Sequence, residues 1–118
     1  MTAKSLEAQV RHVSDAAIID LQGDIDAFAE GVLNAAYADA ETRGTSNVVL
    51  NFSDVDYINS TGIALIVSLL AQARKAHRSL LVYGLSDHYL EIFQITRLAD
   101  FMDVLPDEMA ALSKVGAR

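Results

Sequence analysis

The sequence has no cysteine and no tryptophan, and its only proline, Pro106, lies near the end. Without cysteine the chain can form no disulfide, no thiolate nucleophile and no cysteine-ligated metal site. The glycines are isolated from one another, which excludes a glycine-rich phosphate-binding loop. There is no repeat, low-complexity tract or linker, so the 118 residues predict one domain over 1–118, with its core at about 6–112.

Basic residues are also scarce. Nine Lys and Arg stand against sixteen Asp and Glu, a net charge of −7. This balance argues against direct nucleic-acid binding and against an anionic membrane surface, and it leaves room for a basic protein partner. The first seven residues lack an apolar signal core. The longest apolar run, 63–71, contains Ser68 and is too short to span a bilayer. We therefore expect a soluble, cytoplasmic protein without membrane insertion.

The hydrophobic pattern predicts an α/β fold. Two strands over 6–13 and 17–23, joined by Ser14-Asp15, suggest an antiparallel hairpin. The expected order then continues with a helix over 27–43, a strand over 48–52, a helix over 61–76, a strand over 79–83, a short helix over 87–94, a marginal strand near 101–104 and a last helix with Pro106-Asp107-Glu108 in its first turn. This order predicts a mixed sheet of four to five strands with about four helices packed on it.

Two helices carry informative patterns. The helix over 27–43 has apolar residues at helical spacing, and these predict its buried face: Phe28, Val32, Leu33, Ala36, Tyr37 and Ala40. The helix over 61–76 is so apolar that most of its circumference is expected to be buried. One stripe of it is small or polar: Thr61, Ala64, Ser68, Gln72 and Lys75. The commoner interpretation is a plain solvated face; the alternative is that its small residues leave the helix N-terminus open to close approach by another macromolecule.

Ser60 precedes this helix and has two interpretations. Serine is a favourable N-cap, and capping is the simpler function. A helix N-terminus also presents unpaired N–H groups and a positive dipole, which suit a phosphate. A catalytic serine would need a base, but the histidines lie in segments without evident relation to Ser60, and no nucleophile elbow surrounds it.

The aspartates form two pairs. Asp24 and Asp26 lie at the end of a strand, and Asp54 and Asp56 repeat the same spacing in an expected loop. Such pairs can serve as acid and base or hold Mg²⁺, but solvated turn residues are the commoner case and the one we favour. The histidines lack metal-site spacing. The sequence therefore predicts no catalytic constellation, no metal site and no cofactor.

Several motifs follow one another in a specific order over about residues 15–112. They are Gly23-Asp24-Ile25-Asp26, Val48-Val49-Leu50-Asn51-Phe52, Tyr57-Ile58-Asn59-Ser60-Thr61-Gly62, Leu80-Leu81-Val82-Tyr83-Gly84-Leu85-Ser86, Ile92-Phe93-Gln94-Ile95-Thr96-Arg97-Leu98, and then Phe101 and Pro106-Asp107-Glu108. Their order and spacing resemble the STAS domain family, and more closely the bacterial anti-sigma factor antagonists.

The resemblance implies a non-enzymatic switch. In that family the antagonist binds an anti-sigma factor that is also a serine kinase, and this binding frees the sigma factor. Phosphorylation of the hydroxyl that corresponds to Ser60 breaks the complex, and a PP2C-type phosphatase restores it. Asp26 matches an acidic residue that lies close to the phosphoacceptor. The expected partner-binding residues are Asp24, Asp26, Asn59, Thr61, Gly62, Ala64 and Ser68.

Two residues depart from the family pattern. Asn59 stands where the family usually has Asp, and Arg97 stands where glycine is common. The first departure favours an alternative, a non-switching STAS subunit of a stress-sensing scaffold or of a lipid-transport or transporter-regulating complex. A dimer or a scaffold assembly is expected accordingly. A small hydrolase or metal enzyme that uses Asp24 and Asp26 is the remaining alternative.

Overall fold

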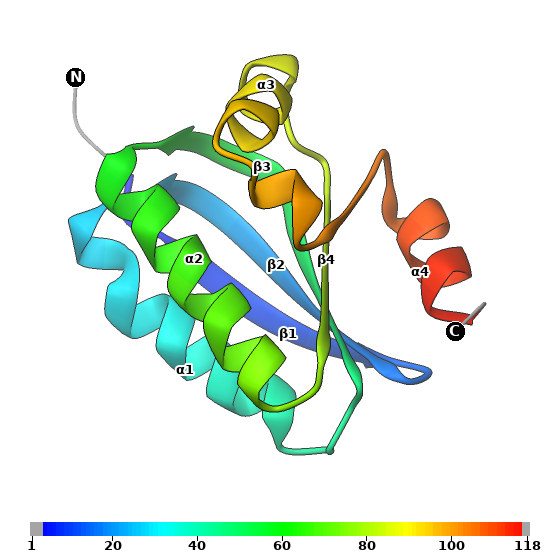
Figure 1. The fold of residues 1–118 in the computed structure, drawn as a ribbon. Helices are drawn as coiled ribbons and strands as arrows, with labels where there is room; N and C mark the ends of the chain where they lie inside the picture. Colours follow the sequence, from blue (N-terminus) through cyan, green and yellow to red (C-terminus); the bar gives the residue numbers. More distant parts are fainter. Residues whose placement is uncertain (1–3, 117–118) are drawn as a thin grey trace.

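A five-stranded mixed sheet in the order β1-β2-β3-β4-β5 forms the centre of the protein (Figure 1). The computed structural model describes residues 4–116. The first three of the seven N-terminal residues, for which no signal core was expected, lie outside the described residues. The expected antiparallel hairpin is confirmed, and the remaining strands pair in parallel. The strands are β1 (Glu7–Val13), β2 (Ala16–Ile25), β3 (Asn47–Ile58), β4 (Ser79–Tyr83) and β5 (Asp103–Leu105).

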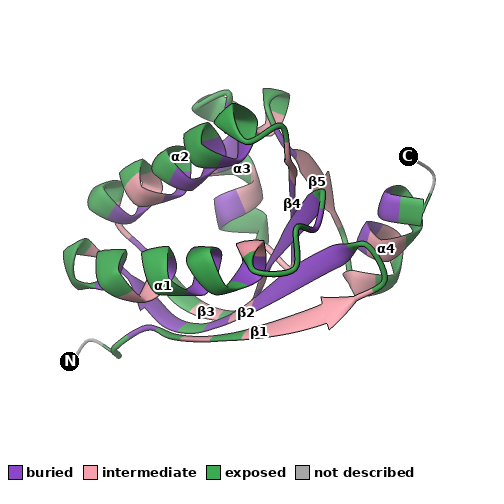
Figure 2. Cartoon of the chain, turned by 90° about the horizontal axis from the view of Figure 1, so that it is seen from below, coloured by how far each residue is buried: buried purple, intermediate pink, exposed green. Residues whose placement is uncertain are grey.

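Four α-helices cover the two faces of the sheet unequally. The helices are α1 (Glu30–Glu41), α2 (Ser60–Lys75), α3 (Asp87–Ile95) and α4 (Glu108–Gly116), with two 3₁₀ turns, η1 (Ala27–Ala29) and η2 (Leu98–Asp100). The first three helices pack over one face, and α4 packs on the other (Figures 1 and 2). Among residues 4–116, no helix is both long enough and apolar enough to cross a bilayer. The predicted α/β sheet with four helices is confirmed.

Alternation along β3 supplies both cores. Val48, Leu50 and Phe52 join the large cluster beneath α1, α2 and α3, where the Phe52 ring meets that of Phe93 edge-on at 6.1 Å. Val49 points the other way, into the smaller cluster beneath α4. Side chains of successive strand residues alternate between faces, so a strand covered on both sides is apolar throughout.

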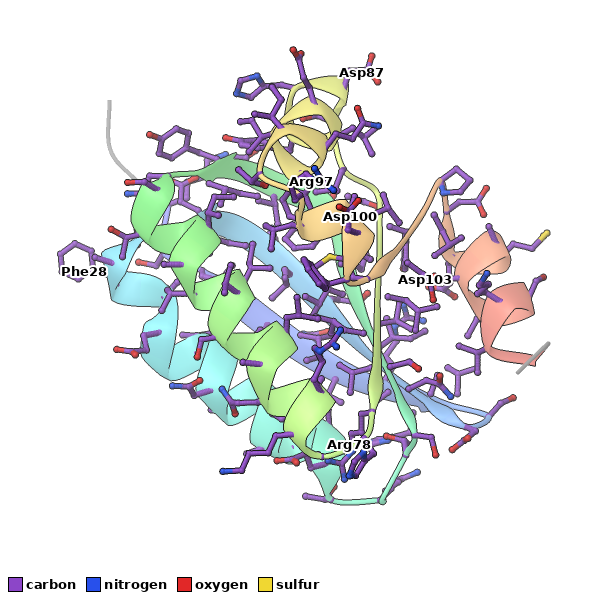
Figure 3. All side chains as sticks on the ribbon, in the orientation of Figure 1. Phe28, Arg78, Asp87, Arg97, Asp100 and Asp103 are labelled. Carbon is purple, nitrogen blue, oxygen red and sulfur yellow. The ribbon has the colours of Figure 1, made fainter. Side chains whose placement is uncertain are left out.

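The first predicted helix differs from the structure at both ends. A 3₁₀ turn occupies 27–29, and α1 runs from Glu30 to Glu41. Most of the predicted apolar face does pack inward, but Phe28 is 92% exposed and points away from the molecule (Figure 3). Phe28 precedes the α-helix, so the 3.6-residue period that aligned it with the later positions does not apply to it.

The predicted acidic loop after residue 52 is wrong. β3 continues to Ile58, and Asp54 and Asp56 are exposed residues of this strand. The pairing of β3 with β2 shifts register twice, between Asp20 and Gln22 and again after Gly23. These shifts allow β3 to stay paired with β2 as far as Ile58. Such bulges add residues to one strand without ending its pairing, so the polar sequence is not a strand terminator here.

The expectation that α2 is buried around most of its circumference is also wrong. Its buried residues occupy the side that faces the sheet, whereas Val67 is 44% exposed. The helix lies against one face only, so its small apolar residues on the outer side meet solvent (Figure 2). The predicted small-residue stripe is confirmed as exposed: Thr61, Ala64, Ser68, Gln72 and Lys75.

A charged network joins α4 to the sheet. The Arg11 guanidinium binds Asp20 at 2.6 Å and Glu108 at 2.6 Å, and the Tyr83 hydroxyl donates to Glu108 at 2.8 Å. The hydrogen bonds from Arg11 lower the pKa of both carboxyl groups. Burial raises the pKa of the Tyr83 hydroxyl, and its hydrogen bond to Glu108 raises that pKa further. Pro106 precedes α4 instead of lying in its first turn, which corrects the predicted start.

Candidate functional site

The turn between β3 and α2 is fixed by Asn59. Its side-chain oxygen accepts a hydrogen bond from the Gly62 N–H at 2.9 Å, so Asn59 is the N-cap of α2. Its own N–H donates to the Ile25 carbonyl at 3.2 Å, which ties the turn to the end of β2. The simpler interpretation of Ser60 as the cap is therefore wrong, because the residue before it has the extended backbone and performs that function.

Gly62 allows this turn to sit directly on β2. A Cβ atom placed on Gly62 would lie 2.0 Å from the Ile25 carbonyl oxygen, far inside van der Waals contact. The obstacle is backbone, which cannot rotate away as a side chain can. Glycine is thus required here for close approach of the helix start to the strand end.

Ser60 is the first residue of α2, and its side chain is exposed. Within the part of the chain that the structure describes, the Ser60 hydroxyl has no hydrogen-bond partner. It stands beside the first N–H groups of a sixteen-residue helix, where the dipole favours negative charge. The position combines accessibility with an environment that tolerates an added phosphate.

The two acids of the Gly23–Asp26 segment have different environments. Asp26 caps η1, its carboxylate accepting from the Phe28 N–H at 2.9 Å, and it directly follows Ile25, to which the α2 turn is bonded. Asp24 is only 9% exposed, and its carboxylate accepts from the Lys4 N–H at 3.0 Å. The expectation that both are solvated turn residues is therefore wrong for Asp24, which holds the N-terminal segment against β2.

Three exposed apolar side chains belong to the elements around this turn, and their exposure was not predicted from the sequence. Phe28 follows Asp26 on η1, which packs against α2. Tyr57, 53% exposed, is near the end of β3, and Val67 lies on the outer side of α2. No periodicity distinguishes these residues from core residues, so local sequence patterns did not predict their exposure.

The end of β3 is held from the other side by α3. The Ile58 N–H donates to the Tyr89 hydroxyl at 2.8 Å, and this hydrogen bond is buried. The turn at Asn59 is therefore fixed by a strand end on one side and by a helix on the other. Such a rigid support suits a recognition site whose geometry has to persist when a partner binds.

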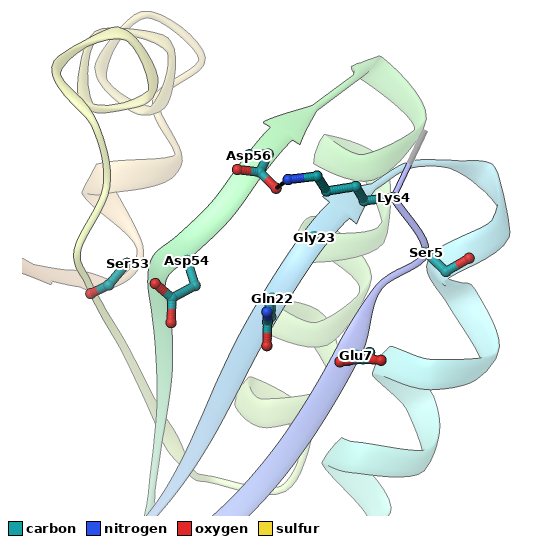
Figure 4. Close-up of a pocket in the computed structure, with 8 residues that line it drawn as sticks. All are labelled: Lys4, Ser5, Glu7, Gln22, Gly23, Ser53, Asp54 and Asp56. Atoms are coloured by element: carbon teal, nitrogen blue, oxygen red, sulfur yellow. Dashed lines mark ion pairs between the residues drawn. The ribbon is translucent and has the colours of Figure 1, made fainter. Parts of the chain in front are cut away.

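A separate polar hollow of about 510 Å³ is lined by residues of β1, β2 and β3 and of the segment before β1 (Figure 4). The Lys4 ammonium pairs with the Asp56 carboxylate at 3.4 Å across it. Asp54 also lines the hollow, but within residues 4–116 no three His, Asp or Glu side chains gather as a metal site would require. The hollow thus brings the second aspartate pair together with a lysine.

Comparison with known proteins identifies the family of this chain. Residues 8–106 match the sequence model of a family described as "Mlab, STAS domain". An anti-sigma-B factor antagonist from Staphylococcus aureus (strain NCTC 8325 / PS 47) is 29% identical over 86 residues, which is 73% of this chain and 80% of that protein. The resemblance inferred from the sequence is therefore confirmed.

Solved structures confirm the fold that the resemblance implied. An anti-sigma factor antagonist from Mycobacterium paratuberculosis superposes with a TM-score of 0.81 at 18% identity, covering 94% of each chain. The Bacillus cell fate determinant SpoIIAA in its phosphorylated form superposes with a TM-score of 0.70 at 21% identity, covering 92% of this chain and 98% of that one. At these identities the likeness concerns the fold alone.

Proposed function

Because this chain belongs to the STAS domain family, we propose that it acts as an anti-sigma factor antagonist, working in the cytoplasm by binding and without catalysis. Its partner in this proposal is an anti-sigma factor with serine kinase activity, and binding frees the sigma factor. Relatives that bear the name anti-sigma-B factor antagonist cover most of this chain and support the assignment.

Phosphorylation of Ser60 is the proposed switch, and a PP2C-type phosphatase reverses it. One observation carries this assignment: Asn59 performs the capping, which leaves the exposed Ser60 hydroxyl free for modification. The phosphate adds about −1.5 to −2 charges at a helix N-terminus, where an anion is well tolerated. A structure of the fold-related SpoIIAA in a phosphorylated form supports the idea that this fold accommodates the group.

The proposed partner-binding surface surrounds this hydroxyl. It comprises the exposed small residues of α2, the Asn59 turn and the capping acid Asp26, and we add Phe28 as an aromatic contact because it is 92% exposed. Aromatic side chains dominate the binding energy of many interfaces. Asp24 and Gly62 support the surface from within, since both are buried. The phosphate then opposes binding through its desolvation cost and its repulsion toward acidic groups.

The test is phosphorylation by the anti-sigma kinase of the same organism with ATP, measured by intact-mass spectrometry. We expect one phosphate on the wild-type chain, none on Ser60→Ala, and one on the matched control Thr61→Ala. Phosphorylation should weaken kinase binding more than a hundredfold, which corresponds to about 3 kcal/mol. Equal phosphate incorporation in Ser60→Ala and wild type would reject Ser60 as the acceptor.

Asn59 favours one second candidate, a non-switching STAS subunit of a scaffold or of a transport-regulating complex. This residue stands where the switching family usually has Asp, yet it caps α2 fully. Size measurement of the native protein distinguishes the candidates. A scaffold subunit co-purifies in a large assembly and carries no phosphate on Ser60, whereas an antagonist exchanges between a small free form and a kinase complex.

A further inference from the structure

Within the described residues 4–116, no strand pairs with the main-chain groups on the outer edge of β1. β1 is a terminal strand of the sheet and pairs with β2 on one side only (Figure 2). The two-residue loop Ser14-Asp15 is closed by the pair Val13 and Ala16. Such a closing pair is hydrogen-bonded, and bonded and non-bonded pairs alternate along an antiparallel ladder. The N–H and C=O groups of Ala8, Val10 and His12 therefore point away from β2.

This edge lacks several of the features that usually prevent strand pairing, although Glu7 and Arg11 give the strand charge. Proteins commonly protect an edge strand with lysine, proline, a bulge or a covering segment. The segment 7–13 contains neither lysine nor proline, and its register with β2 runs without a shift. Both irregularities in the sheet belong to the pairing of β2 with β3. β1 thus presents a regular seven-residue edge.

An apolar hollow runs beside this edge. It has a volume of about 600 Å³, and it lies between β1 and the outer side of α1. Its lining is mostly small and aliphatic: Ala8, Val10, Val32, Ala35 and Ala36, with Gln9 and Asp39. An added strand would complete the sheet and bring apolar atoms over this hollow, so main-chain pairing and burial favour the same partner geometry.

We propose that a second copy of this chain pairs with β1, antiparallel and with Val10 opposite Val10 of the second copy. This register places Ala8 opposite His12, so all three outward-pointing residues of each copy meet outward-pointing residues. If the register slipped by one residue, main-chain groups that point outward would lie opposite groups that point toward β2. The side chains of the second copy would also change to the opposite face of the sheet. A slip by two would leave one outward residue without a partner.

Side-chain chemistry agrees with the same register. Val10 meets its own copy, Gln9 meets Arg11, and Glu7 meets Val13, so no like charges stand opposite each other. The two α1 helices lie on the same side of the continuous sheet, with Val32 and Ala35 near the junction. Ser60 follows the end of β3, two strands away from the edge, and stays accessible in both copies.

Disulfide trapping tests the register directly, because the natural chain has no cysteine. Hydrogen-bonded antiparallel residues have Cα atoms about 5.5 Å apart, within disulfide range. We expect Val10→Cys to form a covalent dimer on mild oxidation, and Ala8→Cys to cross-link with His12→Cys but not with itself. Gln94→Cys, exposed on α3, is the control. Equal cross-linking of Val10→Cys and Gln94→Cys would overturn the proposal.

Sedimentation equilibrium of the cysteine-free chain tests the dimer without trapping. We expect a concentration-dependent dimer of twice 12.8 kDa that tightens with added salt, because each copy carries a net charge of −7. Val10→Lys, which sets two ammonium groups opposite each other, should weaken association at least tenfold, whereas Val10→Thr should retain it. Circular dichroism establishes that both variants fold. If the wild type stays a monomer at all concentrations, or if Val10→Lys leaves the dimer unchanged, β1 self-pairing is rejected. Self-pairing is rejected too if this edge pairs only with a strand of another protein, because the wild type alone is then a monomer.

Discussion

At the scale of single residues, the β3–α2 turn divides two functions between neighbours. Asn59 satisfies the helix N-terminus through the Gly62 N–H, whereas the Ser60 hydroxyl has no hydrogen-bond partner among residues 4–116. A modification on the capping atom itself would disrupt the helix start. Placing the hydroxyl one residue later separates the proposed switch from the structural support, so a change of phosphorylation state leaves the cap in place.

This division predicts unequal mutational costs for adjacent residues. Asn59→Ala should lower the free energy of unfolding by about 1 kcal/mol, since the cap is lost. Ser60→Ala should change it by less than about 0.5 kcal/mol, because no hydrogen bond is lost and alanine is a good helix former. Urea denaturation of both variants measures the difference. A Ser60→Ala cost equal to that of Asn59→Ala would contradict the assigned cap.

Arg97 shows a second effect at this scale. It has a left-handed backbone, with φ of 68°, directly before η2. This explains why glycine is common at the corresponding position of the family, since glycine adopts positive φ without steric cost. The guanidinium forms an exposed ion pair with Asp100 at 2.6 Å. The replacement of glycine by Arg97 therefore affects the backbone conformation before η2 and does not involve the Ser60 turn.

At the scale of elements, α4 is attached to the sheet by charge as well as by packing. Ala111 and Val115 fill the small core, and the beginning of the helix is held by the contact of Glu108 with Arg11. Asp20 shares the same guanidinium from the neighbouring strand. One arginine on β1 therefore links the hairpin to the last helix, and both carboxyl groups depend on it.

This network predicts a pH-dependent contribution to stability. The pKa values of Asp20 and Glu108 are lowered in the folded state, so the stabilisation is complete above their ordinary pKa of about 4 and is lost as pH falls through the folded values. Arg11→Met should cost about 1 kcal/mol near neutral pH, a modest value because the pairs are partly exposed, and the cost should shrink below about pH 4.

Denaturant unfolding at a series of pH values measures this difference between wild type and Arg11→Met. Arg43→Met is the matched control, because it removes the same charge from an exposed position after α1. The difference in the free energy of unfolding between Arg43→Met and wild type should not decrease below about pH 4 as it does for Arg11→Met. A cost of Arg11→Met that stays constant from neutral to acid pH would show that the guanidinium contributes packing alone.

At the scale of the whole molecule, the proposed switch lies outside the cores. The large cluster is enclosed between the sheet and α1, α2 and α3, and the Ser60 turn is at the carboxyl end of the parallel strands. The β1 edge is at the side of the sheet. Kinase binding and β1 pairing therefore use different surfaces, and a failure of one proposal leaves the other standing.

We expect phosphorylation of Ser60 to leave the global fold unchanged. The midpoint temperature of unfolding should shift by no more than a few degrees, because the phosphate is exposed and lies at the favourable end of the helix dipole. Differential scanning calorimetry of the phosphorylated and unmodified chains measures this shift. A large loss of stability would mean that the modification acts by unfolding α2, contrary to a switch at the binding surface.

The sequence alone determined the order of the elements and the exposed stripe on α2. Hydrophobic periods of 2 and 3.6 residues are local properties, so the hairpin, the buried strands and the helices could be read from residue spacing. The motif order also identified the family. The cap assignment failed, since Ser60 and Asn59 are both favourable capping residues and the choice depends on which one has the extended backbone.

Only the tertiary structure decided the environments of the polar residues. Asp54 and Asp56 belong to a strand because bulges preserve its pairing with β2, and Asp24 is buried because Lys4 returns to it across the chain. Phe28 is 92% exposed because the 3₁₀ turn directs it away from the core, and β1 is an edge strand because, within residues 4–116, only β2 pairs with it. Local spacing specifies which side chains can share a face, but exposure depends on segments distant in sequence, and these meet only in the folded protein.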